Sequence, residues 1–224
     1  MKTFRLFNKL LATAILLILL SSTTERIPKI LIIGDSISGG YTPFVKEHFE
    51  GKAIVEHNPG NAGDTGRGLE NIREWLSDGE WDIIHFNWGL WDLCYRHPDA
   101  KVYGNRDKIN GTQTFSVEEY AANLDSLVTI MKEMTDAELV FLTTTYVPES
   151  EAGRYAKDAI RYNRAAKKVM KKHSVKVNDI FRESAIIHKE HCTRSDDVHF
   201  TDEGSEKLAK LVNSYLEKKI SELK

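Results

Sequence analysis

Two short segments near opposite ends of the chain contain residue types that together can perform acyl transfer. Residues 34–37 read Gly-Asp-Ser-Ile and present a serine where an apolar, strand-like run gives way to a helix. Residues 196–199 read Asp-Asp-Val-His. A serine hydroxyl becomes a good nucleophile when a base takes its proton, and an imidazole base needs a carboxylate to orient it. We therefore predict that Ser36, His199 and Asp196 form a catalytic triad.

Two further segments contain polar or glycine residues at the ends of predicted strands. The loop at 58–66 reads Asn-Pro-Gly-Asn-Ala-Gly-Asp-Thr-Gly, which suits a turn, or a backbone N–H that points at a developing oxyanion. Residues 86–92 read Phe-Asn-Trp-Gly-Leu-Trp-Asp. Their aromatic side chains fit either a core or a sugar-binding cleft, and Asn87 is the polar exception in an apolar run. An amide at a strand end can donate to an oxyanion.

Apolar runs alternate with amphipathic segments of helical length along the rest of the chain. The predicted strands are 29–33, 53–57, 81–86, 138–143 and 175–177, and the predicted helices are 42–50, 68–77, 117–134, 154–173 and 203–220. This alternation predicts a parallel sheet with helices on both faces. Ligands bind such sheets beyond the carboxyl ends of the strands, where the segments described above would meet. The long connection at 92–115 is either functional or disordered.

The N-terminus has the layout of a secretory signal peptide. Lys2, Arg5 and Lys9 precede the mostly apolar run at 10–20, and small polar residues follow it. An uncleaved membrane anchor is the alternative, but the run is short for the ~20 residues that span a bilayer. We predict a signal peptide at 1–24 and one catalytic domain at 25–224. The mature protein would be secreted or periplasmic, without stable membrane insertion.

Composition and charge exclude several classes of partner. The net charge is −2 with both signs interspersed. The basic residues at 167–172 fit a solvated helix face better than a nucleic-acid patch, so we predict no nucleic-acid partner. One set of potential metal ligands is His188, His191, Cys192, Asp196 and His199. These residues lack the spacing of strong zinc motifs, and we predict no metal and no cofactor.

The chain has two cysteines, Cys94 and Cys192. Export permits a disulfide, and both positions are expected at the same end of the sheet. We predict a disulfide between them near the active site. Two buried free thiols are the alternative, because the sequence does not give the Cα distance that a disulfide requires.

The four segments in this order resemble the SGNH (GDSL-type) hydrolase superfamily over roughly residues 29–216. The resemblance implies a flavodoxin-like three-layer α/β/α sandwich with a central parallel five-stranded sheet. It also implies that Ser36 is the nucleophile, His199 the base and Asp196 the orienting carboxylate. Asp197 is the alternative partner of His199, but its spacing of two residues matches the family motif less well. The oxyanion hole would then include the backbone N–H groups of Ser36 and Gly63.

The third segment departs from the family pattern Gly-x-Asn-Asp, because residues 89–92 read Gly-Leu-Trp-Asp. Trp91 stands where the family has the asparagine that donates to the oxyanion. Asn87 would share a face with Trp91 if the extended conformation persists. Our hypothesis is that Asn87 replaces the missing donor.

We therefore predict an exported serine esterase that removes a small acyl group, such as acetyl, from a carbohydrate. Trp88, Trp91 and Tyr95 are the predicted substrate contacts. The partner is a small-molecule or glycan ester, and the oligomeric state is left open. Two alternatives remain: a carbohydrate O-acyltransferase on the same fold, and a non-catalytic glycan-binding protein, which the substitution at Trp91 would fit.

Overall fold

The computed structural model describes residues 26–77 and 79–223. The predicted signal peptide at 1–24 lies outside these residues. Within the described part of the chain, no helix combines the length and apolar character needed to cross a lipid bilayer.

A five-stranded parallel sheet forms the centre of the fold. Its strands are β1 (Lys29–Ile33), β2 (Ile54–His57), β3 (Ile83–Phe86), β6 (Glu138–Leu142) and β7 (Lys176–Asn178). They lie in the order β2-β1-β3-β6-β7, and every neighbouring pair is parallel. This is the flavodoxin-like order, which reverses direction next to β1 and places a ligand crevice at its carboxyl end. The predicted three-layer fold with five parallel strands is confirmed.

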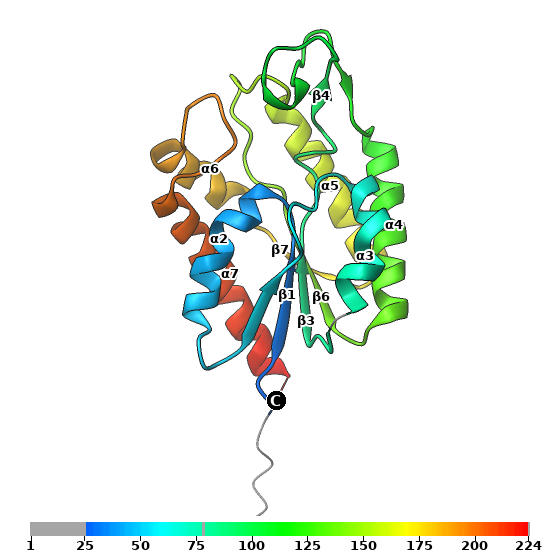
Figure 1. The fold of residues 1–224 in the computed structure, drawn as a ribbon, viewed down its shortest axis with the longest axis vertical. Coiled ribbons are helices and arrows are strands. Elements are labelled where there is room, and N and C mark those ends of the chain that lie inside the picture. The colour runs from blue at the N-terminus through cyan, green and yellow to red at the C-terminus, as the bar shows by residue number, and fades with distance from the viewer. Residues whose placement is uncertain (1–25, 78, 224) are drawn as a thin grey trace, which may run out of the picture.

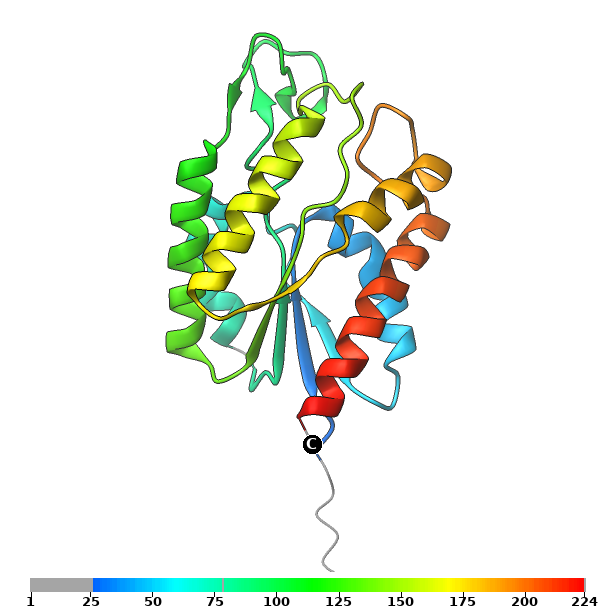
Figure 2. The ribbon, with the colours of Figure 1, turned by 180° about the vertical axis from the view of Figure 1, so that it is seen from behind.

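Helices cover both faces of this sheet (Figures 1 and 2). They are α2 (Ser36–His48), α3 (Thr65–Ser77), α4 (Val117–Met134), α5 (Ala156–Lys172), α6 (Phe181–His191) and α7 (Asp202–Glu222). On one side, α2 and α6 both pack against α7. On the other side, α4 packs between α3 and α5. Strand β1 is apolar from Ile30 onward, with Ile30, Ile32 and Ile33 fully buried, because both of its faces are covered.

The helices begin earlier than their apolar pattern indicates at the two places nearest the site. Helix α2 starts at Ser36 instead of residue 42, and α3 starts at Thr65 instead of residue 68. Both first turns contain glycine, at Gly39 and Gly66 for example, and glycine weakens a helical pattern in sequence. Helix α6 was not predicted, because it buries only Ser184 and His188 and so shows little apolar periodicity.

The long connection between residues 92 and 115 is ordered and projects beyond the carboxyl ends of the strands (Figure 1). It contains the short antiparallel pair β4 (Tyr95–Arg96) and β5 (Thr112–Gln113), with a 3₁₀ turn, η1 (Tyr103–Asn105), between them. Backbone hydrogen bonds join it to the loop before α5, at Gly153 and Ala152. The connection is therefore a fixed wall above the sheet.

A buried carboxylate joins the third segment to the start of α3. Asp92 is fully buried, and its Oδ1 accepts hydrogen bonds from the backbone N–H of Thr65, at 2.9 Å, and from the Thr65 hydroxyl. Its Oδ2 is buried without a hydrogen-bond partner among the described residues. Burial raises the pKa of Asp92 to about 7, against the opposing effect of the Thr65 donors. A proton on Asp92 is thus favoured by the fold.

This burial predicts a pH-dependent cost to stability. The folded state holds the Asp92 proton up to about pH 7, whereas the unfolded chain releases it at about pH 4, so the free energy of unfolding falls as pH rises through this window. The slope is at most about 1.4 kcal/mol per pH unit. Asp92→Asn does not titrate. Urea unfolding at both ends of the window should show the parent losing stability relative to the variant; a difference that is constant with pH would contradict this account.

Candidate active site

The turn from β1 into α2 presents Ser36 to solvent. Asp35 is the N-cap of α2, and its side chain accepts a hydrogen bond from the backbone N–H of Ile37 at 2.9 Å. Asp35 is buried, whereas Ser36 is exposed as the first residue of the helix. The N–H groups of a first helical turn have no partner within the helix, and the helix dipole places partial positive charge there. This position favours an anion beside the Ser36 backbone N–H.

Ser36 and His199 are brought together at the carboxyl edge of the sheet. The Ser36 Oγ lies 2.9 Å from the His199 Nε2, within hydrogen-bond distance. The other ring nitrogen, His199 Nδ1, lies 2.6 Å from Oδ1 of Asp197. The resulting order, hydroxyl to imidazole to carboxylate, is the geometry needed to activate a serine nucleophile.

The carboxylate in this arrangement is Asp197, which corrects the expectation for Asp196. Asp196 is exposed, and its Oδ1 accepts a hydrogen bond from Nε of Arg194 at 2.9 Å. Asp197 instead accepts from both the backbone N–H and the ring Nδ1 of His199, at 3.3 and 2.6 Å. The reason is local. The backbone N–H of Asp197 donates to the carbonyl of Arg194, and this turn directs the Asp196 side chain to solvent. Asp197 lies two residues before His199, so its carboxylate can contact both the backbone N–H and the ring of His199.

The loop that presents Asp197 and His199 is held at several points. The backbone carbonyl of Asp197 lies 2.6 Å from Nε2 of His188, a residue at the end of α6. The backbone N–H of Thr193 donates to the carbonyl of His199 at 3.0 Å, and the side chain of Val198 is buried. These contacts fix the position of the His199 imidazole.

Asp35 and Asp197 have pKa values displaced in opposite directions. Burial alone would raise the pKa of Asp197, but the hydrogen bond and charge of His199 outweigh it and hold that pKa below its ordinary value. Burial raises the pKa of Asp35, although the Ile37 N–H and the charges of Arg154 and His199 oppose the rise. Asp197 is therefore the residue that remains an anion against the imidazole.

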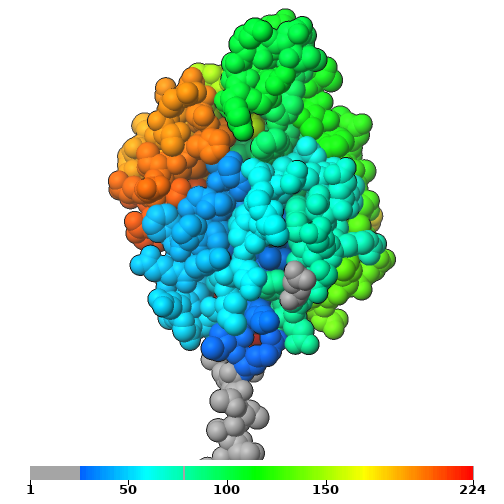
Figure 3. Space-filling model, in the orientation of Figure 1, coloured from blue at the N-terminus to red at the C-terminus, as the bar shows by residue number. Residues whose placement is uncertain are grey.

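A pocket of about 320 Å³ opens at Ser36 and His199. Its lining residues come from the segments that follow β1, β2, β3 and β6 and from the loop between α6 and α7: Asp35, Ser36, Asn61, Leu90, Trp91, Arg96, Tyr103, Gly104, Arg106, Arg154, Asp197, Val198 and His199. In Figure 3 the 92–115 connection (green) and the segment before α7 (orange) stand on either side of it, above the start of α2 (blue). A larger hollow of about 700 Å³ between α5 and α6 contains neither Ser36 nor His199.

The glycine-rich loop contributes Asn61 to this pocket. Gly63 has a positive φ of 62°, and its backbone N–H donates to Oδ1 of Asn61 at 2.8 Å. The N–H expected to face an oxyanion is thus occupied by a side chain, and Gly63 lines an adjoining hollow. The Asn61 Nδ2 has no protein partner among the described residues, and Asn61 lines both hollows. Sequence reasoning missed Asn61, although an Asn two residues before a turn glycine is a signal for this bond.

The structure does not place Asn87 in the pocket, which corrects the hypothesis that it replaces the missing donor. Its Nδ2 donates to the backbone carbonyl of Leu142 at 2.8 Å, so the amide joins the ends of β3 and β6. Alternation along the strand predicted a shared face with Trp91, but the strand ends at Phe86 and the chain then turns.

Of the three predicted substrate contacts, only Trp91 lines the pocket. Trp88 is buried in the core, where its indole N–H donates to the carbonyl of Ala62 at 3.4 Å. The Tyr95 hydroxyl donates to Asp158 on α5 at 3.3 Å, and its ring packs against Tyr155. Both corrections have one cause, namely that aromatic residues near strand ends also fill the space between sheet and helices.

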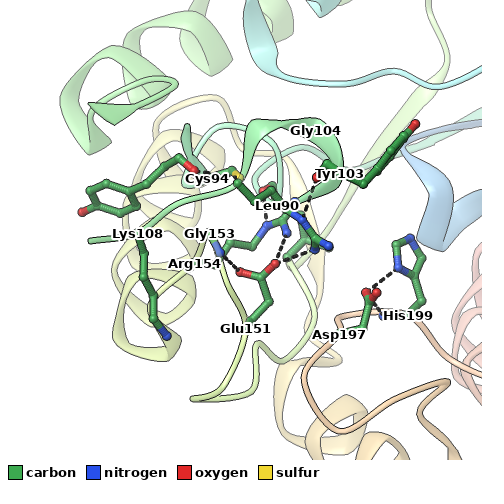
Figure 4. Close-up of polar contacts among 12 residues, drawn as sticks. Leu90, Cys94, Tyr103, Gly104, Lys108, Glu151, Gly153, Arg154, Asp197 and His199 are labelled. Atoms are coloured by element: carbon green, nitrogen blue, oxygen red, sulfur yellow. Dashed lines mark hydrogen bonds and ion pairs between the residues drawn. The ribbon is translucent and has the colours of Figure 1, made fainter. Parts of the chain in front are cut away.

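Cys94 and Cys192 are free thiols, so the predicted disulfide is wrong for this structure. Cys94 belongs to the 92–115 connection and is buried close to Gly153 (Figure 4). Cys192 ends α6 and pairs with Phe200 through the backbone. The two thus belong to different walls of the site. Across residues 26–77 and 79–223, no group of three or more potential metal ligands comes together.

A second serine–histidine contact lies close to the first. The Ser38 Oγ is 2.7 Å from Nε2 of His57, but Ser38 is buried and does not line the pocket. The other ring nitrogen of His57 faces the backbone carbonyl of Asn58 instead of a carboxylate. This pair therefore lacks both access and an orienting anion, and Ser36 is the candidate nucleophile.

The comparisons with known proteins agree with this architecture. The model of the GDSL-like Lipase/Acylhydrolase family matches residues 32–207, and the chain therefore belongs to this family of carboxylic ester hydrolases. No curated protein matches the sequence of the chain.

Three solved structures illustrate the similarity of fold. A lipase/acylhydrolase from Enterococcus faecalis superimposes with a TM-score of 0.68 at 18% identity, covering 86% of this chain and 96% of its own. The psychrotrophic esterase EstA from Pseudoalteromonas sp. gives 0.64 at 15% identity, with coverages of 86% and 98%. A catalytic mutant of Axe2, an acetylxylan esterase from Geobacillus stearothermophilus, gives 0.63 at 18% identity, with coverages of 83% and 92%.

The neighbouring aspartates provide a matched test of the site. Asp197→Asn should lower the kcat for p-nitrophenyl acetate by about 10⁴-fold, because the imidazole loses the anion that orients it and stabilises its protonated form. Asp196→Asn changes the same residue type one position away and should leave kcat within about twofold, since exposed ion pairs contribute little. The reverse pattern would assign the role to Asp196.

A second test separates the two asparagines. Asn61→Asp retains the acceptor for the Gly63 N–H but replaces the free amide donor with an oxygen that repels an oxyanion. It should lower the kcat for p-nitrophenyl acetate by about 10²–10³-fold. Asn87→Ala should lower the free energy of unfolding by about 1 kcal/mol and leave the kcat of the folded enzyme largely intact. Loss of turnover in Asn87→Ala alone would restore Asn87 as the donor.

Proposed function

We propose that this chain is an exported serine esterase that removes a small acyl group, such as acetyl, from a carbohydrate. The observation on which the proposal depends is the continuous contact from Ser36 through His199 to Asp197 at the floor of an open pocket. Nucleophile, base and orienting carboxylate are all within hydrogen-bond distance, as serine acyl transfer requires.

In the proposed reaction the Ser36 Oγ attacks the ester carbonyl while His199 Nε2 accepts its proton. Asp197 stabilises the resulting imidazolium through Nδ1. The Ser36 backbone N–H, at the positive end of α2, and the Asn61 amide donate to the tetrahedral oxyanion. His199 then protonates the leaving alcohol, and water releases the acyl group from Ser36 by the same steps in reverse order.

Three features support a small acyl group on a carbohydrate. The pocket of about 320 Å³ is at the small end of ligand sites, which leaves little room for a long acyl chain. Trp91 offers an aromatic side chain on the pocket wall. Among the structures with this fold, one is named as an acetyl xylan esterase and another as an acetylxylan esterase. Export is proposed on the sequence of residues 1–24 alone.

The test compares two serines that each contact a histidine. The parent should hydrolyse p-nitrophenyl acetate and release acetate from acetylated xylan. Ser36→Ala should lower both activities by about 10⁴-fold or more, because the nucleophile is lost. Ser38→Ala removes the buried hydroxyl and should retain turnover in the protein that folds. Brief incubation with p-nitrophenyl acetate and mass spectrometry should locate an acetyl group on Ser36.

Two outcomes would contradict the proposal. Equal background rates for the parent and Ser36→Ala would exclude serine catalysis with these esters. Loss of activity in Ser38→Ala, with Ser36→Ala active, would move the nucleophile to the buried pair. N-terminal sequencing of the protein recovered from an expressing cell's exterior or periplasm tests export separately.

A further inference from the structure

Three arginines line the pocket on the side away from His199: Arg96, Arg106 and Arg154. We refer to these three as the arginine wall. In the described part of the chain, the one carboxylate that pairs with them is Glu151, at 2.6 Å from Arg106 and 2.9 Å from Arg154. Three guanidinium groups and one carboxylate leave an excess of two positive charges there. Figure 4 shows Glu151 and Arg154 facing the Asp197–His199 pair across the site.

The positions of the wall side chains are fixed by the fold. Glu151 is fully buried, and its second oxygen accepts the backbone N–H of Gly153 at 2.7 Å. Arg154 donates from Nε to the carbonyl of Leu90 at 2.7 Å. Arg106 donates from Nε to the carbonyl of Tyr103 at 3.1 Å. Their side chains are only 6% and 12% exposed, so little orientational freedom remains to be lost when a ligand binds.

Each guanidinium keeps donors that the protein does not use. Arg154 and Arg106 make their hydrogen bonds through Nε and Nη1, and Arg96 does the same with Thr114 and the carbonyl of Gly104. The Nη2 group of each arginine has no hydrogen-bond partner among the described residues. The Arg96 guanidinium lies over the Trp91 ring at 4.9 Å and has no carboxylate partner in the same part of the chain.

A mostly buried cation without a full counter-charge is costly, and the cost is removed when an anion binds. The acids on the catalytic side do not supply that anion, because Asp197 is paired with His199 and Asp35 caps α2. The charge of the wall extends across the pocket, since Arg154 lowers the pKa of Asp35 and Arg106 lowers that of Asp197. A ligand bound at Ser36 experiences the same field.

We propose that the arginine wall binds a carboxylate in the sugar half of the substrate, so that the acylated carbohydrate is an acidic one, with a uronic acid at or next to the scissile ester. This inference rests on the proposed esterase function and adds a charge requirement to it. Guanidinium N–H pairs match the two oxygens of a carboxylate, and such charge-assisted hydrogen bonds are stronger than neutral ones. The Nη2 groups of the wall are the donors, and Trp91 lies beside the sugar ring.

The test uses one acetylated sugar in two charge states. O-acetylated methyl glucuronoside is offered as the free carboxylate and as its neutral carboxamide, and acetate release is measured. The carboxylate should be preferred by about tenfold or more in kcat/KM, mainly through KM, and the preference should fall with added salt. Arg96→Gln and Arg106→Gln should each reduce the preference. Arg106→Lys should restore part of it, which a purely structural role would not produce. Arg164→Gln, an exposed charge removal on α5, is the control.

Equal kcat/KM for the two sugars overturns the inference. Preference for mono-p-nitrophenyl succinate over p-nitrophenyl acetate, without preference for the uronate, assigns the carboxylate to the acyl half and overturns the sugar assignment. If the parent hydrolyses no ester, the proposed function fails while the wall remains testable. Calorimetry with the Ser36→Ala variant should then show tighter binding of methyl glucuronoside than of its carboxamide, and equal binding overturns the wall as a carboxylate site.

Discussion

The hydrogen bond between Ser36 and His199 joins positions 163 residues apart, and most of the fold contributes to its geometry. One end depends on the abrupt change from β1 to α2, where Asp35 caps the helix and Ser36 is its first residue, exposed to solvent. The other end depends on the loop between α6 and α7. Because α2 and α7 pack against each other, the two ends are held side by side. The distance of 2.9 Å between Ser36 Oγ and His199 Nε2 would not persist between flexible segments. Here Ser36 is the first residue of α2, and the loop with His199 leads directly into α7.

The carboxyl edge of the sheet provides the rest of the site. Parallel strands all end in the same direction, so each connection contributes side chains to one rim. In this chain, two of these connections contribute different residues to the pocket. The glycine-rich loop places Asn61 in the pocket with Ser36, and the 92–115 connection contributes Arg96 and Arg106 of the arginine wall. Asp92 joins them, since its buried carboxylate holds the start of α3 while its backbone carbonyl accepts the N–H of Phe115. Recognition and chemistry are therefore coupled through one buried acid.

The architecture was predictable from the sequence because its signals are repetitive. Apolar strands alternating with amphipathic helices recur along the whole chain, and an error at any one boundary leaves the topology intact. The site depended on single residues, and there sequence reasoning was weaker. A spacing rule favoured Asp196, yet the direction of one turn selected Asp197. Strand alternation favoured Asn87, but the strand ends one residue before it. The arginines gave no signal because Arg96, Arg106 and Arg154 are scattered in sequence and meet only through tertiary folding.

Glu151 is shared between two arginines that come from different segments, and this sharing limits how the arginine wall can change in evolution. Loss of Arg106 alone would leave the carboxylate to Arg154, whereas loss of Glu151 alone would leave two guanidinium groups facing each other in a buried space. A single substitution that removes Arg106 is therefore tolerated, whereas a single substitution that removes Glu151 is disfavoured. Related chains with a different preference for substrate charge are expected to differ at these positions in concert, with Arg106 lost before Glu151 in any lineage that leads away from the present arrangement.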